Sequence, residues 1–208
     1  MPTPKFDRIA KEFMSRIGDN FETEFIIGAA MPEGEILSAA DISAYVNKSL
    51  LDFFNQLWMS LELKEFIKKV PELVEPLTGE LDVTTGVLSI PTGRKNFYKL
   101  IGAVTSSDVF ITIEEADEYS LYKSSYLSDY EATADEPVCI QLGLDKIEFF
   151  PSSILKAKLI YIKLPLSPTD GSFLIQNGSN DSPFADHWNS KIAEIAERFY
   201  KIDRQQEQ

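Results

Sequence analysis

The sequence has little of the material from which most enzyme and metal sites are built. Its 208 residues include one cysteine, Cys139, and one histidine, His187. A single thiol excludes an internal disulfide framework and a multi-thiolate metal site, and a single imidazole excludes a site with two histidine ligands. Cys139 lies in the apolar run PVCIQL, which favours a buried, unreactive thiol. We expect no metal and no cofactor.

Basic charge and long apolar runs are also scarce. The chain has 20 Lys and Arg against 33 Asp and Glu, a net charge of -13, which argues against a general basic surface for nucleic acid. No stretch approaches the ~20 apolar residues of a membrane span, and the start, MPTPKFDRIA, lacks the apolar core of an export signal. We expect a protein made in the cytoplasm. The acidity favours solubility, or a surface that lets DNA pass without holding it.

Motifs of enzyme chemistry are missing as well. The sequence has no phosphate-binding Gly-Lys-Ser/Thr loop, no G-x-G-x-x-G and no G-x-S-x-G elbow. One group of carboxylates has the spacing for acid–base chemistry or a divalent cation, although a charge run after a strand usually forms a solvated face. This group consists of Glu114, Glu115, Asp117 and Glu118. We therefore expect a protein that is not an enzyme.

The most informative segment is the run from Ile36 to Trp58. Ser38 can cap a helix, with Asp41 three residues later. Apolar residues then recur every three or four positions, which predicts a strong amphipathic helix; they are Ile42, Val46, Leu50, Phe53, Leu57 and Leu61. A second row widens the apolar stripe and comprises Tyr45, Leu51, Phe54 and Trp58. The helix is predicted to pack on two sides, one of them a neighbouring subunit, and to break near residues 60–63.

The middle of the chain is rich in predicted strands. Turn residues separate three pairs of short apolar runs, which predicts three hairpins over 81–90, 97–113 and 137–151, followed by a strand in LKAKLIYIKLP. Between them, tyrosines recur at helical spacing at Tyr119, Tyr122, Tyr126 and Tyr130. That row is either a cover for the sheet or a subunit interface, because tyrosine combines contact area with a polar handle.

The last region begins with a polar loop. Ser182 is a suitable helix cap and Pro183 fits the first helical position, ahead of an amphipathic helix of about five turns. The fold class is therefore α+β, with N-terminal and C-terminal helices packed with a central antiparallel β-rich region. The predicted divisions are a helical region over 1–76, a β-rich region over 77–165, and a loop and C-terminal helix over 166–208 that packs back on the helical region.

Large aromatic residues on the predicted helices are the candidate residues of a subunit interface. They are Tyr45, Phe54, Trp58, Tyr119, Tyr122, Tyr126 and Trp188. Each by itself fits a core position, but together they exceed the needs of one modest domain.

Several segments, taken in order, resemble the head–tail connector proteins of tailed phages, most closely the ring or adaptor proteins of crAss-like podophages. They are LSAADISAYVNKSLLDFFNQ, VLSIP, DEPVCIQL, IEFFPSS, KLIYIKLP and HWNSKIAEIAERFY. The resemblance runs from about Leu37 onward and lies in the order and spacing of packing patterns, including strands that end at Pro91, Pro151 and Pro165.

The resemblance implies a structural virion protein at the head–tail junction, made in the host cytoplasm. It would form a homo-oligomeric ring between portal and tail, with portal, tail or other ring proteins as partners and no membrane. DNA would pass through the lumen without sequence-specific binding. The acidic residues Glu114, Glu115, Asp117 and Glu118 would face that lumen or keep the free protein soluble.

Two alternatives come from other classes of protein. One is a cytosolic, non-enzymatic binding or regulatory domain that uses the tyrosine segment as its recognition surface. The other is an enzyme in which the clustered carboxylates hold a divalent metal.

Overall fold

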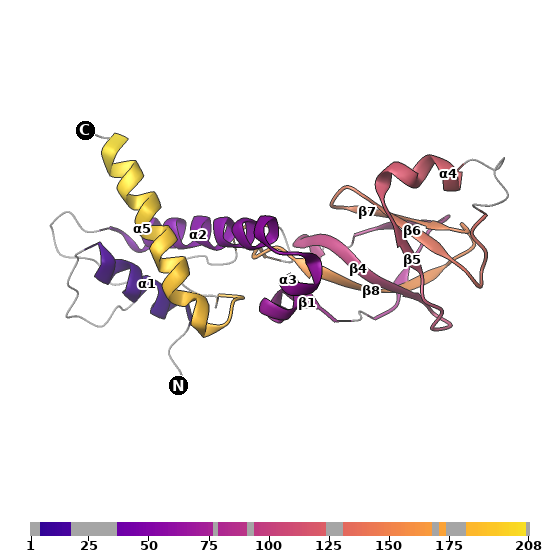
Figure 1. Ribbon diagram of the computed structural model, residues 1–208, viewed down its shortest axis with the longest axis horizontal. Coiled ribbons are helices and arrows are strands. Elements are labelled where there is room, and N and C mark those ends of the chain that lie inside the picture. Colours follow the sequence, from indigo (N-terminus) through magenta and orange to yellow (C-terminus); the bar gives the residue numbers. More distant parts are fainter. Residues whose placement is uncertain are drawn as a thin grey trace. The chain divides into compact units, whose positions relative to one another are not determined.

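The computed structural model describes residues 5–17, 37–76, 79–90, 94–123, 131–167, 171–173 and 182–206. The chain divides into two compact units, drawn in Figure 1. A helical unit combines residues 1–73 with residues 172–208, and a β unit comprises residues 74–171. Helices from both ends of the chain and sheets from its middle make the fold α+β, as the sequence predicts.

The helical unit contains four α-helices and two short 3-10 turns within the described residues. These are α1 (Lys5–Arg16), α2 (Ala39–Ser60), α3 (Leu63–Lys69), η1 (Pro71–Leu73), η5 (Asp186–Trp188) and α5 (Asn189–Gln206). The start of α2 is the predicted one: Asp41 N donates to Ser38 Oγ (3.2 Å), and Ser38 N donates to Asp41 Oδ2 (3.0 Å). This capping box satisfies two amides that the first turn leaves without partners. The predicted break is also present, because α2 ends at Ser60 and α3 begins at Leu63.

Helix α5 packs against both α1 and α2 and so brings the two ends of the chain into one core. The apolar stripes of the three helices face inward: Ile9 and Phe13 of α1, Val46 of α2 and Ile192 of α5 are all fully buried. Ring contacts between helices add to this core, since Tyr200 of α5 lies 6.3 Å from Phe13, between ring centroids.

The start of α5 differs from the prediction. Ser182 does not cap this helix, because its Oγ accepts from Phe184 N (3.2 Å) in a local turn. The chain then passes through η5, and α5 begins only at Asn189. The reason is packing. Phe184 is buried with its ring 5.1 Å from that of Phe53, so this residue packs on α2 from the segment before the helix and not from the first turn of α5.

The β unit contains eight short strands, a 3-10 turn and one short helix within the described residues. They are β1 (Val74–Glu75), β2 (Leu81–Asp82), β3 (Val87–Ser89), β4 (Phe97–Thr105), β5 (Thr112–Glu114), η3 (Ala116–Glu118), α4 (Tyr119–Lys123), β6 (Val138–Leu142), β7 (Lys146–Phe150) and β8 (Lys156–Lys163).

The strands form two sheets. In the first, β8 pairs with β4 along one edge and with β1 and β2 along the other, always antiparallel. The second has the order β3-β7-β6-β5, and its pairs are antiparallel except for the parallel pair β5–β6. The inner faces of both sheets share one apolar core, which includes Leu100, Leu159, Cys139, Ile147 and Phe149.

One of the three predicted hairpins forms as expected. Strands β6 and β7 pair directly through the turn at Gly143–Asp145, with Cys139 opposite Phe149. The other two predictions are wrong in their pairing. The turn at Thr84–Val87 forms, with Gly86 at φ +77°, but Leu81 pairs with Ala157 in one sheet and Leu88 with Ile147 in the other.

The predicted hairpin over 97–113 keeps a single bridge, between Val104 and Phe110, before β5 leaves to pair with β6. In both wrong cases the turn carries the chain from one sheet to the other. Each strand reaches the shared core better by joining a different sheet than by pairing with its neighbour in sequence. Turn chemistry thus determines the reversal but not the partner.

Candidate functional site

The aromatic residues of the helical unit mostly serve its own core. Phe54 has no exposed surface, and its ring lies 5.7 Å from Phe66 and 6.5 Å from Trp58, between centroids. Helix α3 folds back to place Phe66 there, and the sequence gives no direct sign of that contact. The protomer covers Phe54 completely, so the expected contact of Phe54 with a neighbouring subunit stays a prediction for which this chain exposes no surface of the ring.

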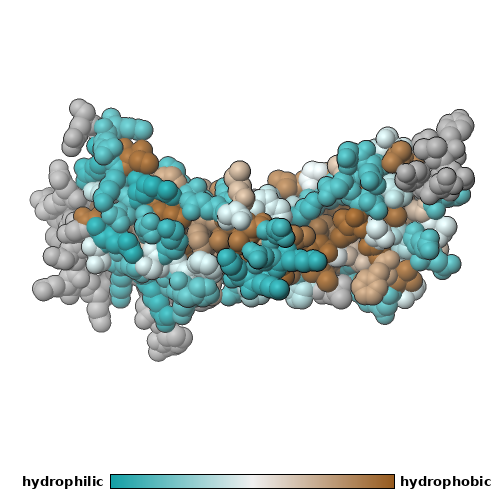
Figure 2. Space-filling model, viewed as in Figure 1, coloured by the Kyte–Doolittle hydropathy of each residue, from teal (hydrophilic) through white to brown (hydrophobic). Residues whose placement is uncertain are grey.

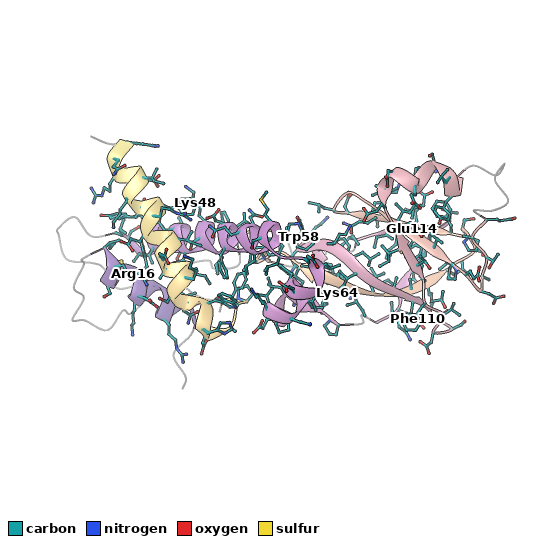
Figure 3. All side chains as sticks on the ribbon, viewed as in Figure 1. Arg16, Lys48, Trp58, Lys64, Phe110 and Glu114 are labelled. Carbon is teal, nitrogen blue, oxygen red and sulfur yellow. The ribbon has the colours of Figure 1, made fainter. Side chains whose placement is uncertain are left out.

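The other three aromatic candidates of this unit are partly buried. Tyr45 packs between Phe13 and Tyr200, with centroid separations of 5.8 and 5.9 Å. Trp58, labelled in Figure 3, lies 5.3 Å from Phe66. These contacts leave only part of each ring for another molecule.

Trp188 packs on Phe53 at 5.1 Å and on exposed His187 at 4.6 Å. Its Nε1 is buried without a hydrogen-bond partner among the described residues. The indole therefore belongs to the packing of η5 on α2.

The tyrosine row is described as far as Lys123, and Tyr126 lies outside the described residues. Tyr119 and Tyr122 both pack on Phe150 of β7, at 6.2 and 5.9 Å between ring centroids. Tyr119 Oη donates to Glu148 Oε2 (2.9 Å), and Lys123 Nζ donates to Glu148 Oε1 (3.2 Å). The hydrogen bond to the Tyr119 oxygen, followed by the bond and charge of Glu148, raises the pKa of Lys123. This network fastens α4 to the outer side of β7.

The acidic candidates lie together where β5 leads into η3. Glu114 ends the strand, Glu115 precedes the turn, and Asp117 and Glu118 are in it. The charge of Glu114 is the largest cause that raises the pKa of Glu118, with partial burial and a hydrogen bond to Glu114 adding to it. The carboxylates therefore repel one another. Among the described residues, no three His, Cys, Asp or Glu side chains converge to hold a metal ion.

One exposed surface of the β unit was not among the sequence-based candidates. Ile111 and Ile113 face the core, so alternation turns Thr112 and Glu114 of β5 outward, and Phe110, just before the strand, is exposed as well. Phe110 is 84% exposed, and Figure 3 shows it at the end of the connection between β4 and β5. We call these three residues, together with Glu115, the Phe110 surface. The alternation in VFITIE is the sequence signal that would have identified it.

Phe110 is not an isolated apolar residue. It is bridged to Val104 of β4, which pairs in turn with Lys158 of β8. Figure 2 shows hydrophobic side chains gathered over β4 and β8 on the face in view. Lys158 Nζ lies 3.0 Å from Asp108 Oδ1 at the margin of this face.

The helical unit has a second exposed apolar surface, at the junction of α2 and α3. Met59 is 87% exposed and Leu63 is 40% exposed. Lys64 and Lys68 follow on α3, one turn apart, and both are exposed. Neither lysine makes an ion pair with another residue in the described part of the chain. We call the exposed side chains of Met59 and Leu63 the Met59 surface. Met59 falls outside the apolar stripe of α2, which is the sign in the sequence that it faces away from the core.

A pocket of about 330 Å³ lies between α2 and α5. Its walls carry both signs of charge, and these charges are already paired: Arg198 with Asp52 at 3.2 Å, and Lys191 with Glu194 at 3.0 Å. An incoming charged ligand would therefore have to break existing ion pairs. We assign it no ligand.

Cys139 is fully buried in β6, as predicted, and burial raises the pKa of its thiol to about 12. The thiolate is the reactive form of cysteine, so the thiol is unreactive at neutral pH while the β unit stays folded. Within the described residues, no helix is both long and apolar enough to cross a membrane.

Two comparisons with known proteins were informative only in finding no match. Neither a scan against protein-family models nor a search of curated proteins finds a match. What the structure defines is an α+β protein of two compact units, each of which exposes large apolar side chains among its described residues.

Proposed function

We propose that this protein is a structural virion protein that assembles as a homo-oligomeric ring between the portal and the tail of a tailed phage. In this role it is a head–tail connector, or adaptor, and genomic DNA passes through the ring without being read. Its partners are further copies of itself and the portal and tail proteins on either side. It acts by association and not by catalysis.

The observation that carries the proposal is the pair of different exposed apolar surfaces. A ring is built from heterologous contacts, in which one surface of each copy meets a different surface of the next. The Phe110 surface and the Met59 surface lie on separate units and differ in structure and charge, as such a contact requires. Removal of one large apolar side chain from water supplies about 1.5–3 kcal/mol.

The order of elements supports the same class. The segments that resemble connector proteins fall on regular elements of the fold. The first and last are largely α2 and α5, and those between them contain strands β3, β6, β7 and β8. The resemblance therefore concerns residues that pack, and not loops.

Cryo-electron microscopy tests the proposal directly. We expect density for a cyclic ring of this chain at the portal exit of the virion, or in the purified protein. A chain that is monomeric in solution and absent from virions would contradict the proposal. A monomer in solution by itself would not, because portal contact can be the step that starts assembly.

A further inference from the structure

We propose that the turn η3 and the helix α4 form a latched cover over an apolar strip on the outer face of the second sheet, with Glu148 of β7 as the latch. The strip consists of Val138, Ile140 and Phe150. The cover opens and closes while the strands beneath it stay paired, and it thereby controls how much apolar surface the β unit presents to water. The inference concerns the β unit of a single copy, so it does not depend on the proposed function.

The strip lies on the outward side of β6 and β7. Cys139 and Phe149 belong to the core that the two sheets share, so their neighbours Val138, Ile140 and Phe150 point to the opposite side. Ile140 has no exposed surface and Val138 is 7% exposed, although neither is part of that core. A part of the chain outside the sheet therefore shields these two side chains from water.

The shield is built from the crossover between β5 and β6. Turn η3 lies beside β6, and α4 packs on β7, where the rings of Tyr119 and Tyr122 contact that of Phe150 (Figure 1). Strands β5 and β6 pair directly with each other, from Thr112 to Glu114 on β5. The cover therefore leaves one strand and returns to its neighbour, so it can lift without breaking their pairing. A helix of five residues is too short to be stable without such contacts.

Glu148 joins the cover to the sheet. It lies directly opposite Ile140 in the register of β6 and β7, on the same outward face. Its carboxylate accepts hydrogen bonds from Tyr119 Oη (2.9 Å) and Lys123 Nζ (3.2 Å), and its side chain is only 12% exposed. Hydrogen bonds to an ionised group are stronger than neutral ones, and water competes little at a mostly buried carboxylate. One side chain of the sheet thus holds the first and the last residue of α4.

The η3 side of the cover experiences the opposite force. Glu114 of β5 lies on the other side of Ile140 in the register, and it faces Glu118 of η3. The charge of Glu114 is the largest cause that raises the pKa of Glu118. Where both carboxylates are ionised they repel each other, so the cover is attracted to β7 and repelled from β5. A short segment under such opposed forces opens locally at a lower free energy than the strands that it covers.

Two adjacent residues of β6 provide the test, because Cys139 faces the core and Ile140 faces the cover. Cys139 is the only cysteine of the chain, so the wild-type thiol reports unfolding of the β unit. A second chain, Cys139→Ala with Ile140→Cys, places the thiol under the cover instead. The rate at which each thiol reacts with dithionitrobenzoate is measured at one pH. We expect the thiol at position 140 to react faster, on the order of tenfold or more, because local opening precedes unfolding.

Two variants in both chains separate the latch from general stability. Glu148→Gln keeps the shape of the side chain but removes its charge, and should speed the reaction at position 140 on the order of tenfold while leaving that of Cys139 unchanged. Glu118→Gln removes the repulsion and should slow the reaction at position 140. Glu80→Gln is the matched control, since Glu80 pairs with Lys156 at 3.4 Å in the first sheet, and it should change neither rate.

Three results would overturn the inference. They are equal rates for the two thiols, a Glu148→Gln change that leaves the rate at position 140 unchanged or raises both rates alike, and a Glu118→Gln change that speeds the reaction. Circular dichroism shows whether each chain is folded, and Val138→Cys in the Cys139→Ala chain repeats the measurement if Ile140→Cys prevents folding. The labelling uses the free chain, so its failure leaves the proposed ring untouched.

Discussion

Phe54 and Met59 lie five residues apart on the same helix and have opposite environments. Phe54 is enclosed by Trp58 and Phe66, whereas Met59 has almost its whole side chain in solvent. Both are large and apolar, so hydrophobicity alone does not distinguish a core residue from an interface residue. The distinction comes from α3, whose Phe66 packs on Phe54 and Trp58 and leaves Met59 in solvent.

Substitution of these two residues should separate stability from association. Phe54→Ala removes a fully buried ring, and we expect the free energy of unfolding of the helical unit to fall by about 3–5 kcal/mol. Met59→Ala removes an exposed side chain and should change that free energy by less than about 0.5 kcal/mol. Urea denaturation followed by circular dichroism measures both.

Oligomerisation provides the second measurement for the same pair. Met59→Ala should weaken self-association while leaving the fold intact. If Phe54→Ala were as stable as the wild type but failed to associate, Phe54 would have to face a neighbour, and the burial described above would not hold in solution.

At the scale of elements, the two sheets are connected by a side chain as well as by strands. Gln141 of β6 reaches across to the edge of β4, where its Oε1 accepts from Leu100 N and its Nε2 donates to Tyr98 O, both at 2.8 Å. Nε2 also donates to Gly143 O at 2.8 Å. The amide thus replaces a neighbouring strand for this part of β4, whose backbone groups would otherwise lack these partners.

Loss of this amide should loosen the edge of β4. We expect Gln141→Ala to lower the free energy of unfolding of the β unit by about 1–3 kcal/mol, because it leaves partly buried backbone groups unsatisfied. Amide hydrogen exchange should accelerate at Leu100 in particular. Gln56→Ala is the matched control, since Gln56 is exposed on α2 and its Nε2 donates to Asp52 Oδ2. Unchanged exchange at Leu100 in the Gln141 variant would contradict the role given to this side chain.

The elements that the sequence predicted well are those determined by local chemistry. Ser38 and Asp41 satisfy each other's backbone amides, and the Gly143–Asp145 turn joins two strands that are also neighbours in the sheet. The errors arise where distant residues decide. The strands around Gly86 pair with β8 and β7, which lie about 60 to 75 residues further along the chain, and Ser182 turns locally because Phe184 packs on Phe53. The candidate residues differ in the same way. The exposure of Phe110 follows from a local alternation in the sequence, whereas the burial of Phe54 depends on Phe66, which α3 brings back onto it.

At the scale of the whole molecule, the two units differ in how the chain builds them. The β unit is continuous, from Val74 to Gly171, and its core is formed by its own strands. The helical unit is discontinuous, because α1 and α2 come from one end of the chain and α5 from the other. Helix α5 packs on both of the earlier helices, so the unit lacks part of its core without it.

Separate expression of the two parts should therefore give different results. We expect a fragment of residues 74–171 to fold by itself, with dispersed amide signals in NMR spectra and one cooperative unfolding transition. A fragment of residues 1–73 should remain largely unfolded, because the apolar faces of α1 and α2 have lost α5. A well-folded 1–73 fragment would show that α5 is an addition to an independent helical core.

The discontinuous helical unit also has a consequence for the order of events during synthesis. The β unit can close as soon as residue 171 has left the ribosome, but the helical core must wait until α5 has been translated. Until then the apolar faces of α1 and α2 lack the helix that covers them. Nascent chains growing side by side on one messenger would therefore each carry a finished β unit before the helical unit of any of them is complete.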